Sequence, residues 1–109
     1  MVVIKVSTSI FSTIKTIERA LEKANLGDEI QLAPGIYKES IQFEETVSIV
    51  GKNGEETIIE GLIIIPKHMT VTFEQLTFIP TAQIYIEGKA IFKDCHFQKK
   101  KTSSIISVN

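Results

Sequence analysis

Residues 12–61 read STIKTIERALEKANLGDEIQLAPGIYKESIQFEETVSIVGKNGEETIIEG, and this stretch decides the fold class. Its first part carries apolar residues at helical spacing, with charged residues opposite: Ile14, Ile17, Ala20, Leu21 and Ala24. This pattern predicts an amphipathic helix over residues 13–24, with Ser12 as its N-cap and a stop before Gly27. From Asp28 onward the apolar period changes to two, which is typical of strands.

Short Ile- and Val-rich runs separated by turn residues fill the rest of the chain. Their apolar positions lie two residues apart, as in Ile30 and Leu32, Ile41 and Phe43, and Val47 and Ile49. The turn signals are Pro34-Gly35 and Gly51-Lys52-Asn53-Gly54. Residues 2–6 read as a first strand, and the all-apolar run 62–65 is typical of a strand between parallel neighbours. No second helix is expected among these strands.

An internal repeat indicates that the strands stack as coils. The segment Phe73-Glu-Gln-Leu76-Thr-Phe78 matches Phe92-Lys-Asp-Cys95-His-Phe97 at an offset of 19 residues. A period near 20 residues is the length of one solenoid coil, whose apolar face must be covered by the next coil. The alternative is a coincidence within a chain rich in Ile and Phe. We predict an all-β fold, a right-handed single-stranded parallel β-helix of about four coils with one capping helix at its amino end.

The composition limits the organisation and the class of partner. A chain of 109 residues is expected to form one domain, residues 1–109, and its net charge of −1 gives no reason to expect nucleic acid as a partner. Residues 1–60 carry six basic and ten acidic side chains, whereas residues 61–109 carry six and three. This asymmetry indicates either two differently charged ends or ordinary solvated faces. Trp is absent and there are only two Tyr, so an aromatic platform for stacking sugars is not expected.

The composition also leads to an expectation about the cellular compartment of the protein. A single cysteine, Cys95, excludes an intramolecular disulfide and fits a reducing compartment. No run approaches the roughly 20 apolar residues of a membrane span, and the first residues are a weak match to a secretory signal. We therefore expect a cytoplasmic protein with no membrane partner. Residues 103–109 read as the start of another strand, and we therefore expect the amino-terminal part of a longer protein rather than an end that meets a partner.

Residues 12–61 resemble the opening of the pectin-lyase-like β-helix superfamily. The matching elements are Thr16-Ile17, Ala20-Leu21, Pro34 to Glu39, Val47 to Gly51 and Thr57 to Gly61. The nearest likeness is to the amino-terminal portion of pectin methylesterases and to bacterial β-helix proteins of unknown role. The resemblance covers residues 12–61 well and residues 70–97 only as generic coils. It implies the fold rather than the chemistry, because the catalytic carboxylates and calcium-binding acids of those families lie in later coils.

Asp94-Cys95-His96 is the one cluster that contains a nucleophile, a base and an acid. Adjacent residues of a strand point to opposite faces, so Cys95 and His96 are expected to diverge. By the repeat, Cys95 takes the place of Leu76 and should point into the core as a small hydrophobe. The structural interpretation is therefore favoured over a Cys–His catalytic pair.

The remaining polar candidates also favour structural roles. Tyr37 and Glu39 share one strand parity, and Glu39 is either an acid–base group or, as we favour, a group that ties down its turn. The pairs Glu44-Glu45 and Glu55-Glu56 are too few for a calcium site unless they converge. Lys99-Lys100-Lys101 either contacts an anionic partner or guards an exposed strand edge, and three lysines are too few to predict nucleic acid. His68 has no second metal ligand nearby, and Gly51–Gly54 is a turn rather than a phosphate loop. We predict no catalytic, metal-binding or cofactor-binding residue.

Two functional hypotheses follow. The first is a non-catalytic scaffold or interaction module that binds a protein or carbohydrate partner through a strand face or its last coil. That coil could also join two copies into a homo-oligomer. The alternative is a fragment or small relative of a carbohydrate-active enzyme, a polysaccharide lyase or pectin esterase. Several convergent acids would favour the enzyme, and the sequence shows no obvious set.

Overall fold

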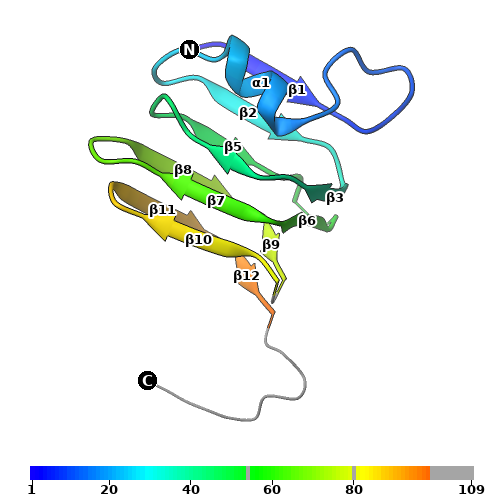
Figure 1. Ribbon diagram of the computed structural model, residues 1–109. Coiled ribbons are helices and arrows are strands. Elements are labelled where there is room, and N and C mark those ends of the chain that lie inside the picture. The colour runs from blue at the N-terminus through cyan, green and yellow to red at the C-terminus, as the bar shows by residue number, and fades with distance from the viewer. Residues whose placement is uncertain (54, 80, 99–109) are drawn as a thin grey trace.

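Three parallel sheets wind into a solenoid in the computed structural model, which describes residues 1–53, 55–79 and 81–98 (Figure 1). The first sheet contains β1 (Val3–Val6), β2 (Glu29–Leu32), β5 (Ser48–Val50), β8 (Thr70–Glu74) and β11 (Lys89–Lys93). The second contains β3 (Gly35–Lys38), β6 (Thr57–Glu60), β9 (Thr77–Phe78) and β12 (His96–Phe97). The third contains β4 (Ile41–Gln42), β7 (Leu62–Ile65) and β10 (Gln83–Ile86).

Each coil visits the three sheets in the same order and in a right-handed sense (Figure 1). The coils are β2-β3-β4, β5-β6-β7 and β8-β9-β10, followed by the first two strands of another coil, β11-β12. The prediction of a parallel β-helix is confirmed. The described residues form three complete coils and part of a fourth, slightly fewer than the four expected. The strand expected at residues 103–109 and the lysines at 99–101 lie outside the described residues.

The 19-residue repeat is confirmed as the offset between the last two coils, whereas paired residues of β5 and β8 are 24 residues apart. Phe73 pairs in register with Phe92, and Phe78 pairs with Phe97. These rings build a ladder through the core: Phe73 stacks on Phe92 at 5.2 Å between centroids and meets Phe78 edge to face at 5.5 Å. Such aromatic pairs add specific geometry to the hydrophobic burial of the rings.

The helix α1 (Ile17–Lys23) is shorter than the sequence predicts, and its N-cap is Thr16 rather than Ser12. The Thr16 hydroxyl accepts a hydrogen bond from the Arg19 N–H at 3.1 Å. Ser12 instead donates its hydroxyl to the Ile14 carbonyl at 2.8 Å. The predicted start at residue 13 is therefore wrong, because apolar spacing alone cannot reveal which backbone N–H groups find an acceptor.

A carboxylate from the coil below the helix decides where α1 begins. Glu39, in the turn between β3 and β4, accepts hydrogen bonds from the N–H groups of Ile17 at 2.8 Å and Glu18 at 3.1 Å. These are two of the first N–H groups of the helix, which have no partner inside it, and a negative charge there is favoured by the helix dipole. The expected local role of Glu39 in its own turn is therefore replaced by a long-range one.

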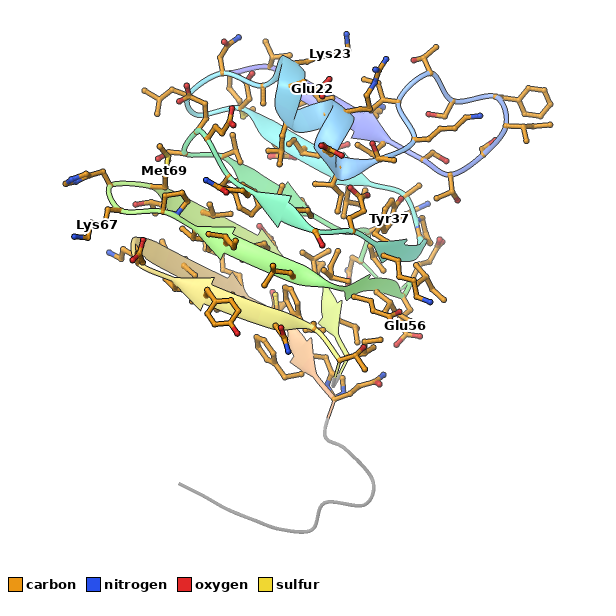
Figure 2. The ribbon with its side chains drawn as sticks, viewed as in Figure 1. Glu22, Lys23, Tyr37, Glu56, Lys67 and Met69 are labelled. Atoms are coloured by element: carbon orange, nitrogen blue, oxygen red, sulfur yellow. The ribbon has the colours of Figure 1, made fainter. Side chains whose placement is uncertain are left out.

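Together, α1 and β1 close the amino end of the solenoid. Ile17 and Ala20 are fully buried against the first coil, and β1 extends the first sheet by one strand above β2. Among the described residues the third sheet has no such extra strand, and α1 lies above it, at the level of β1 (Figure 1). Figure 2 places Glu22 and Lys23 on α1 at this end, and Lys67 and Met69 at the turn between β7 and β8.

Asp28 joins the first strand to the turn that follows α1. Its two carboxylate oxygens accept hydrogen bonds from the N–H groups of Asn25 and Val2, each at 2.9 Å. The side chain is buried, and these bonds lower its pKa because they favour the charged form. The bond to Asn25 has the larger effect on the pKa, and desolvation opposes both bonds without outweighing them.

We expect Asp28→Asn to destabilise the protein at pH 7 and to lose this effect in acid. A carboxylate whose pKa is lowered by folding stabilises the folded state above its unfolded pKa, near 3.8, and that contribution is lost as the pH falls through the lower folded value. Urea unfolding at pH 7 and pH 3 measures the difference between wild type and variant. Asp94→Asn, at an exposed carboxylate, is the control. An Asp28→Asn difference that is the same at both pH values would contradict this account.

Candidate functional site

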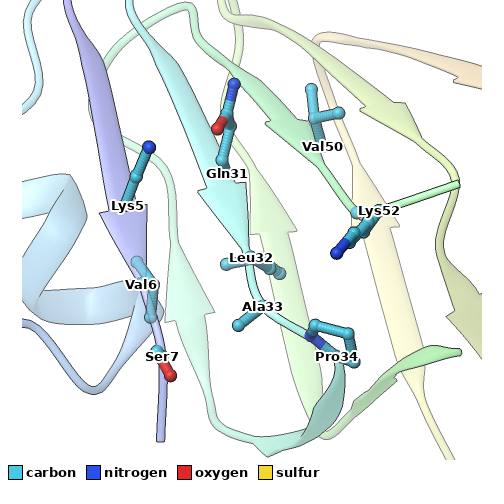
Figure 3. Close-up of a pocket in the computed structure, with 10 residues that line it drawn as sticks. Lys5, Val6, Ser7, Gln31, Leu32, Ala33, Pro34, Val50 and Lys52 are labelled. Atoms are coloured by element: carbon cyan, nitrogen blue, oxygen red, sulfur yellow. The ribbon is translucent and has the colours of Figure 1, made fainter. Parts of the chain in front are cut away.

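A groove of about 540 Å³ lies where the outer face of the first sheet meets the turn toward the second sheet (Figure 3). Lys5, Gln31 and Val50 stand side by side on β1, β2 and β5, in the register of the parallel ladder. We call it the lysine groove and define it by its lining: Lys5, Val6, Ser7, Gln31, Leu32, Ala33, Pro34, Val50, Gly51 and Lys52.

Some polar groups of the lysine groove already form an ion pair or a hydrogen bond with a neighbouring side chain. Lys52 forms an exposed ion pair with Glu55 at 3.6 Å, and the Gln31 amide donates to Glu29 at 2.8 Å. Within the part of the chain that the structure describes, Lys5 forms no salt bridge. The Lys5 ammonium lies beside mostly apolar walls, and this arrangement suits a ligand with an apolar face and one anionic group.

A second, smaller groove of about 290 Å³ separates α1 from β4. We call it the acidic groove, and its lining is Glu18, Leu21 and Glu22 from α1 with Ser40, Ile41, Gln42 and Glu44 from the strand side. Three of these seven residues are glutamates, and no Lys or Arg is among them. The local sequence pattern does not reveal this groove, because one wall comes from Glu18, Leu21 and Glu22 and the other from residues 40–44.

The third feature is the open end formed by β10, β11 and β12, the last strands of their sheets among the described residues. Inward-facing side chains there are far more exposed than their partners one coil above. Ile65 is 0% exposed and its partner Ile86 is 46%, while Phe78 is 2% exposed and its partner Phe97 is 50%. Within residues 1–53, 55–79 and 81–98, these core positions of β10 and β12 are therefore present but uncovered.

Cys95 and His96 diverge, as the sequence predicts. Cys95 is partly buried against the core, and its thiol lies 3.3 Å from the Phe73 carbonyl oxygen, whereas His96 is exposed. Burial raises the pKa of the Cys95 thiol, so the reactive thiolate is disfavoured. The preceding residue, Asp94, occupies a left-handed turn position with φ 52°, one coil below Gln75 with φ 59°. The cluster is a turn and a core residue rather than a nucleophile with its base.

Tyr37 and Glu39 do not form an acid–base pair. The Tyr37 hydroxyl is buried and donates to the Ala33 carbonyl at 2.7 Å. Burial first, and the nearby Glu39 charge second, raise the pKa of Tyr37. Both carboxylate oxygens of Glu39 are occupied by the N-terminal N–H groups of α1. The structural interpretation of these two residues is therefore supported by their hydrogen bonds.

The other polar candidates lie on the surface. Four glutamates, Glu44, Glu45, Glu55 and Glu56, are exposed. In residues 1–53, 55–79 and 81–98, no group of three or more His, Cys, Asp or Glu side chains is placed to hold a metal ion. His68 is exposed in a left-handed turn with φ 68°. Lys52 and Asn53 are exposed at their turn, and Gly54 lies outside the described residues.

Comparisons with known proteins leave the chain without an assigned family. None of the helices in the described ranges has the length and apolar character needed to cross a bilayer. Searches against protein families, curated proteins and solved structures found no match.

Proposed function

We propose that this protein is a non-catalytic solenoid module that binds a partner protein through its open end. One observation carries the proposal: the apolar columns of the core continue into the last described coil, where their side chains lose their cover. Large apolar side chains gathered at one place mark an interaction surface more often than scattered ones do.

The chemistry of the open end defines what a partner must supply. A fully buried Ile or Phe side chain contributes about 1.5–3 kcal/mol, and Ile86 and Phe97 obtain only part of this in the chain described. The outer edges of β10, β11 and β12 also carry backbone N–H and C=O groups that face away from the solenoid. A partner that adds a strand or a coil in register covers the apolar side chains and pairs those backbone groups.

Site-specific photo-crosslinking tests this proposal. A photoreactive phenylalanine analogue at position 97 is expected to give an adduct with one recurrent protein in the producing cell. The same analogue at position 36 is the control, because Ile36 is 59% exposed on the outer side of β3 but lies away from the open end. Ile86→Lys is expected to abolish the adduct at position 97 while leaving the circular dichroism spectrum unchanged. Equal adducts at both positions, or none at 97, would overturn the proposal.

The partner is identified by the mass of the adduct. An adduct of twice the chain mass assigns the open end to a second copy, and light scattering of the purified chain should then show a dimer. A different mass assigns the end to another protein. Either mass supports the proposal of an interaction module. Each also identifies the complex whose structure should be determined next.

We further propose that the chain is related to the pectin-lyase-like superfamily. The support is that residues 12–61, which carry the resemblance, contain the capping helix, the first coil and the first two strands of the second coil of the observed solenoid. A carbohydrate partner on the strand face stays a prediction, and the lysine groove is the place to probe it. The enzyme hypothesis also stays a prediction; turnover of polygalacturonate, with or without Ca²⁺, would displace the non-catalytic module.

A further inference from the structure

We infer that the acidic groove between α1 and β4 takes a short extended peptide with basic side chains, which pairs with the free edge of β4. Three properties of the groove carry this inference: the orientation of the β4 backbone, the missing strand above β4, and the charge of the walls. The occupant is a segment of a partner protein whose Lys or Arg residues alternate with apolar ones.

The backbone of β4 presents hydrogen-bonding groups to the groove. Phe43 donates its N–H to the Ile64 carbonyl of β7 at 3.0 Å, and Ile41 pairs in register with Ile63 on the same strand. In a parallel ladder the N–H and C=O of one residue point to the same side, and successive residues alternate. The N–H and C=O groups of Ser40, Gln42 and Glu44 therefore point away from β7. These are also residues that line the acidic groove.

The sheets differ in the number of strands above the first coil. In the first sheet, β1 covers the edge of β2, with Val3 to Val6 paired to Glu29 to Leu32. In the third sheet, β4 is the edge strand, and α1 covers it without pairing as a strand. The groove of about 290 Å³ is the space left between helix and edge. A short segment added there would continue the third sheet to the level that β1 already reaches.

The charge of the groove selects the segment. Glu18, Glu22 and Glu44 are exposed, and in residues 1–53, 55–79 and 81–98 none of the three forms a salt bridge. The basic residues of the helix region, Lys15, Arg19 and Lys23, are not among the lining residues. A peptide with ammonium or guanidinium groups is therefore attracted, and an acidic peptide is repelled.

The walls also explain the alternation expected in the peptide. Side chains of a strand point alternately to the two sides of the sheet. On the inner side the segment meets Leu21 and Ile41, which offer apolar contact, and on the outer side it meets the carboxylates and water. A sequence such as Lys-Val-Lys-Val-Lys satisfies both sides, and its backbone supplies the partners for Gln42.

Fluorescence anisotropy with the complete chain tests the inference. The probe is a fluorescein-labelled, carboxy-amidated Lys-Val-Lys-Val-Lys peptide in buffer of low ionic strength. We expect saturable binding that weakens with added salt, and at least about tenfold weaker binding of the Glu-Val-Glu-Val-Glu peptide. A Lys peptide with N-methylated valines keeps the charge but loses strand donors, so it should also bind about tenfold more weakly. Equal binding of the methylated peptide would overturn strand pairing.

Variants of the protein test the position of the site. Glu22→Gln and Glu44→Gln are each expected to weaken the Lys peptide about two- to fivefold, as for other exposed charge pairs. Glu56→Gln is the matched control, because Glu56 is an exposed glutamate just before β6, away from α1 (Figure 2). Gln42→Pro removes one groove-facing N–H on an edge strand, where proline is tolerated, and should reduce binding with little change in melting temperature. Loss of binding in Glu56→Gln alone would overturn the assignment.

Amide chemical shifts separate this inference from the proposed function. Binding in the acidic groove should move the amide signals of Ser40, Gln42 and Glu44. Binding at the open end should instead move those of β10, β11 and β12, and would overturn the inference. The acidic groove lies at the capped end of the solenoid, and the proposed interaction surface lies at the other end. Peptide binding in the groove can therefore be disproved without disproving partner binding at the open end, and the reverse also holds.

Discussion

Replacing Phe73 by alanine is expected to lower the free energy of unfolding by about 3–5 kcal/mol, the range for removing a buried aromatic ring. Phe73 lies at the centre of the aromatic ladder: its ring is buried and contacts the rings of Phe43, Phe78 and Phe92 at 5.2–5.9 Å between centroids. Loss of the ring therefore leaves a cavity bounded by three coils. Because small domains are stable by only about 5–15 kcal/mol, this substitution removes much of the total.

Urea denaturation followed by circular dichroism measures the effect. Phe11→Ala is the control, because Phe11 is 90% exposed in the loop before α1 and should change the stability little. Phe73→Asp and Ile49→Asp place a charge at paired core positions and are expected to prevent folding. A soluble Phe73→Asp protein with an unchanged melting temperature would contradict the observed register.

Replacing Gly61 by alanine is the second change with a large expected effect, about 2–6 kcal/mol, because two costs add. Gly61 has φ +119°, a conformation that side chains rarely adopt, and such strain costs about 1–3 kcal/mol. An added Cβ would also collide with the Glu39 carbonyl group, with its carbon at 2.9 Å. Overpacking adds about 1–3 kcal/mol, and the obstacle here is backbone, which cannot rotate away.

Gly27→Ala separates the two costs. Gly27 also has a positive φ, +85°, but nothing lies within 4 Å of the position that its Cβ would occupy. This variant should therefore lose only the conformational part, about 1–2 kcal/mol. Equal losses of stability in Gly27→Ala and Gly61→Ala would show that close approach of the coils at Gly61 is unimportant. The Gly61 variant should also loosen the attachment of α1, since Glu39 holds the helix N-terminus.

The two ends of the solenoid have different surfaces because the stack of coils ends differently at each. At the amino end, α1 replaces a strand and leaves the acidic groove beside β4. At the other end of the described residues, Ile86 and Phe97 repeat positions that are buried one coil above. A stack of identical coils has uniform sides, so its two ends are where the surfaces differ most from one coil to the next.

Much of the solenoid could be predicted from the chain alone, whereas the candidate sites could not. The 19-residue offset located Phe73 opposite Phe92, and alternation of residues separated Cys95 from His96. The start of α1 could not be predicted, because the acceptor for its first N–H groups is Glu39, more than 20 residues away. The acidic groove and the hydrogen bond between Val2 and Asp28 could not be predicted for the same reason, because each depends on contacts between distant segments.

The sequence by itself determined the offset between the last two coils and the side of each strand that faces the core, because these follow from local spacing and hydrophobic burial. Only the tertiary structure decided where the helix begins, which strand edge stays free, and which core positions lie uncovered. These depend on how many strands each sheet contains at each level. That number is a property of the stack as a whole, and no single repeat contains it.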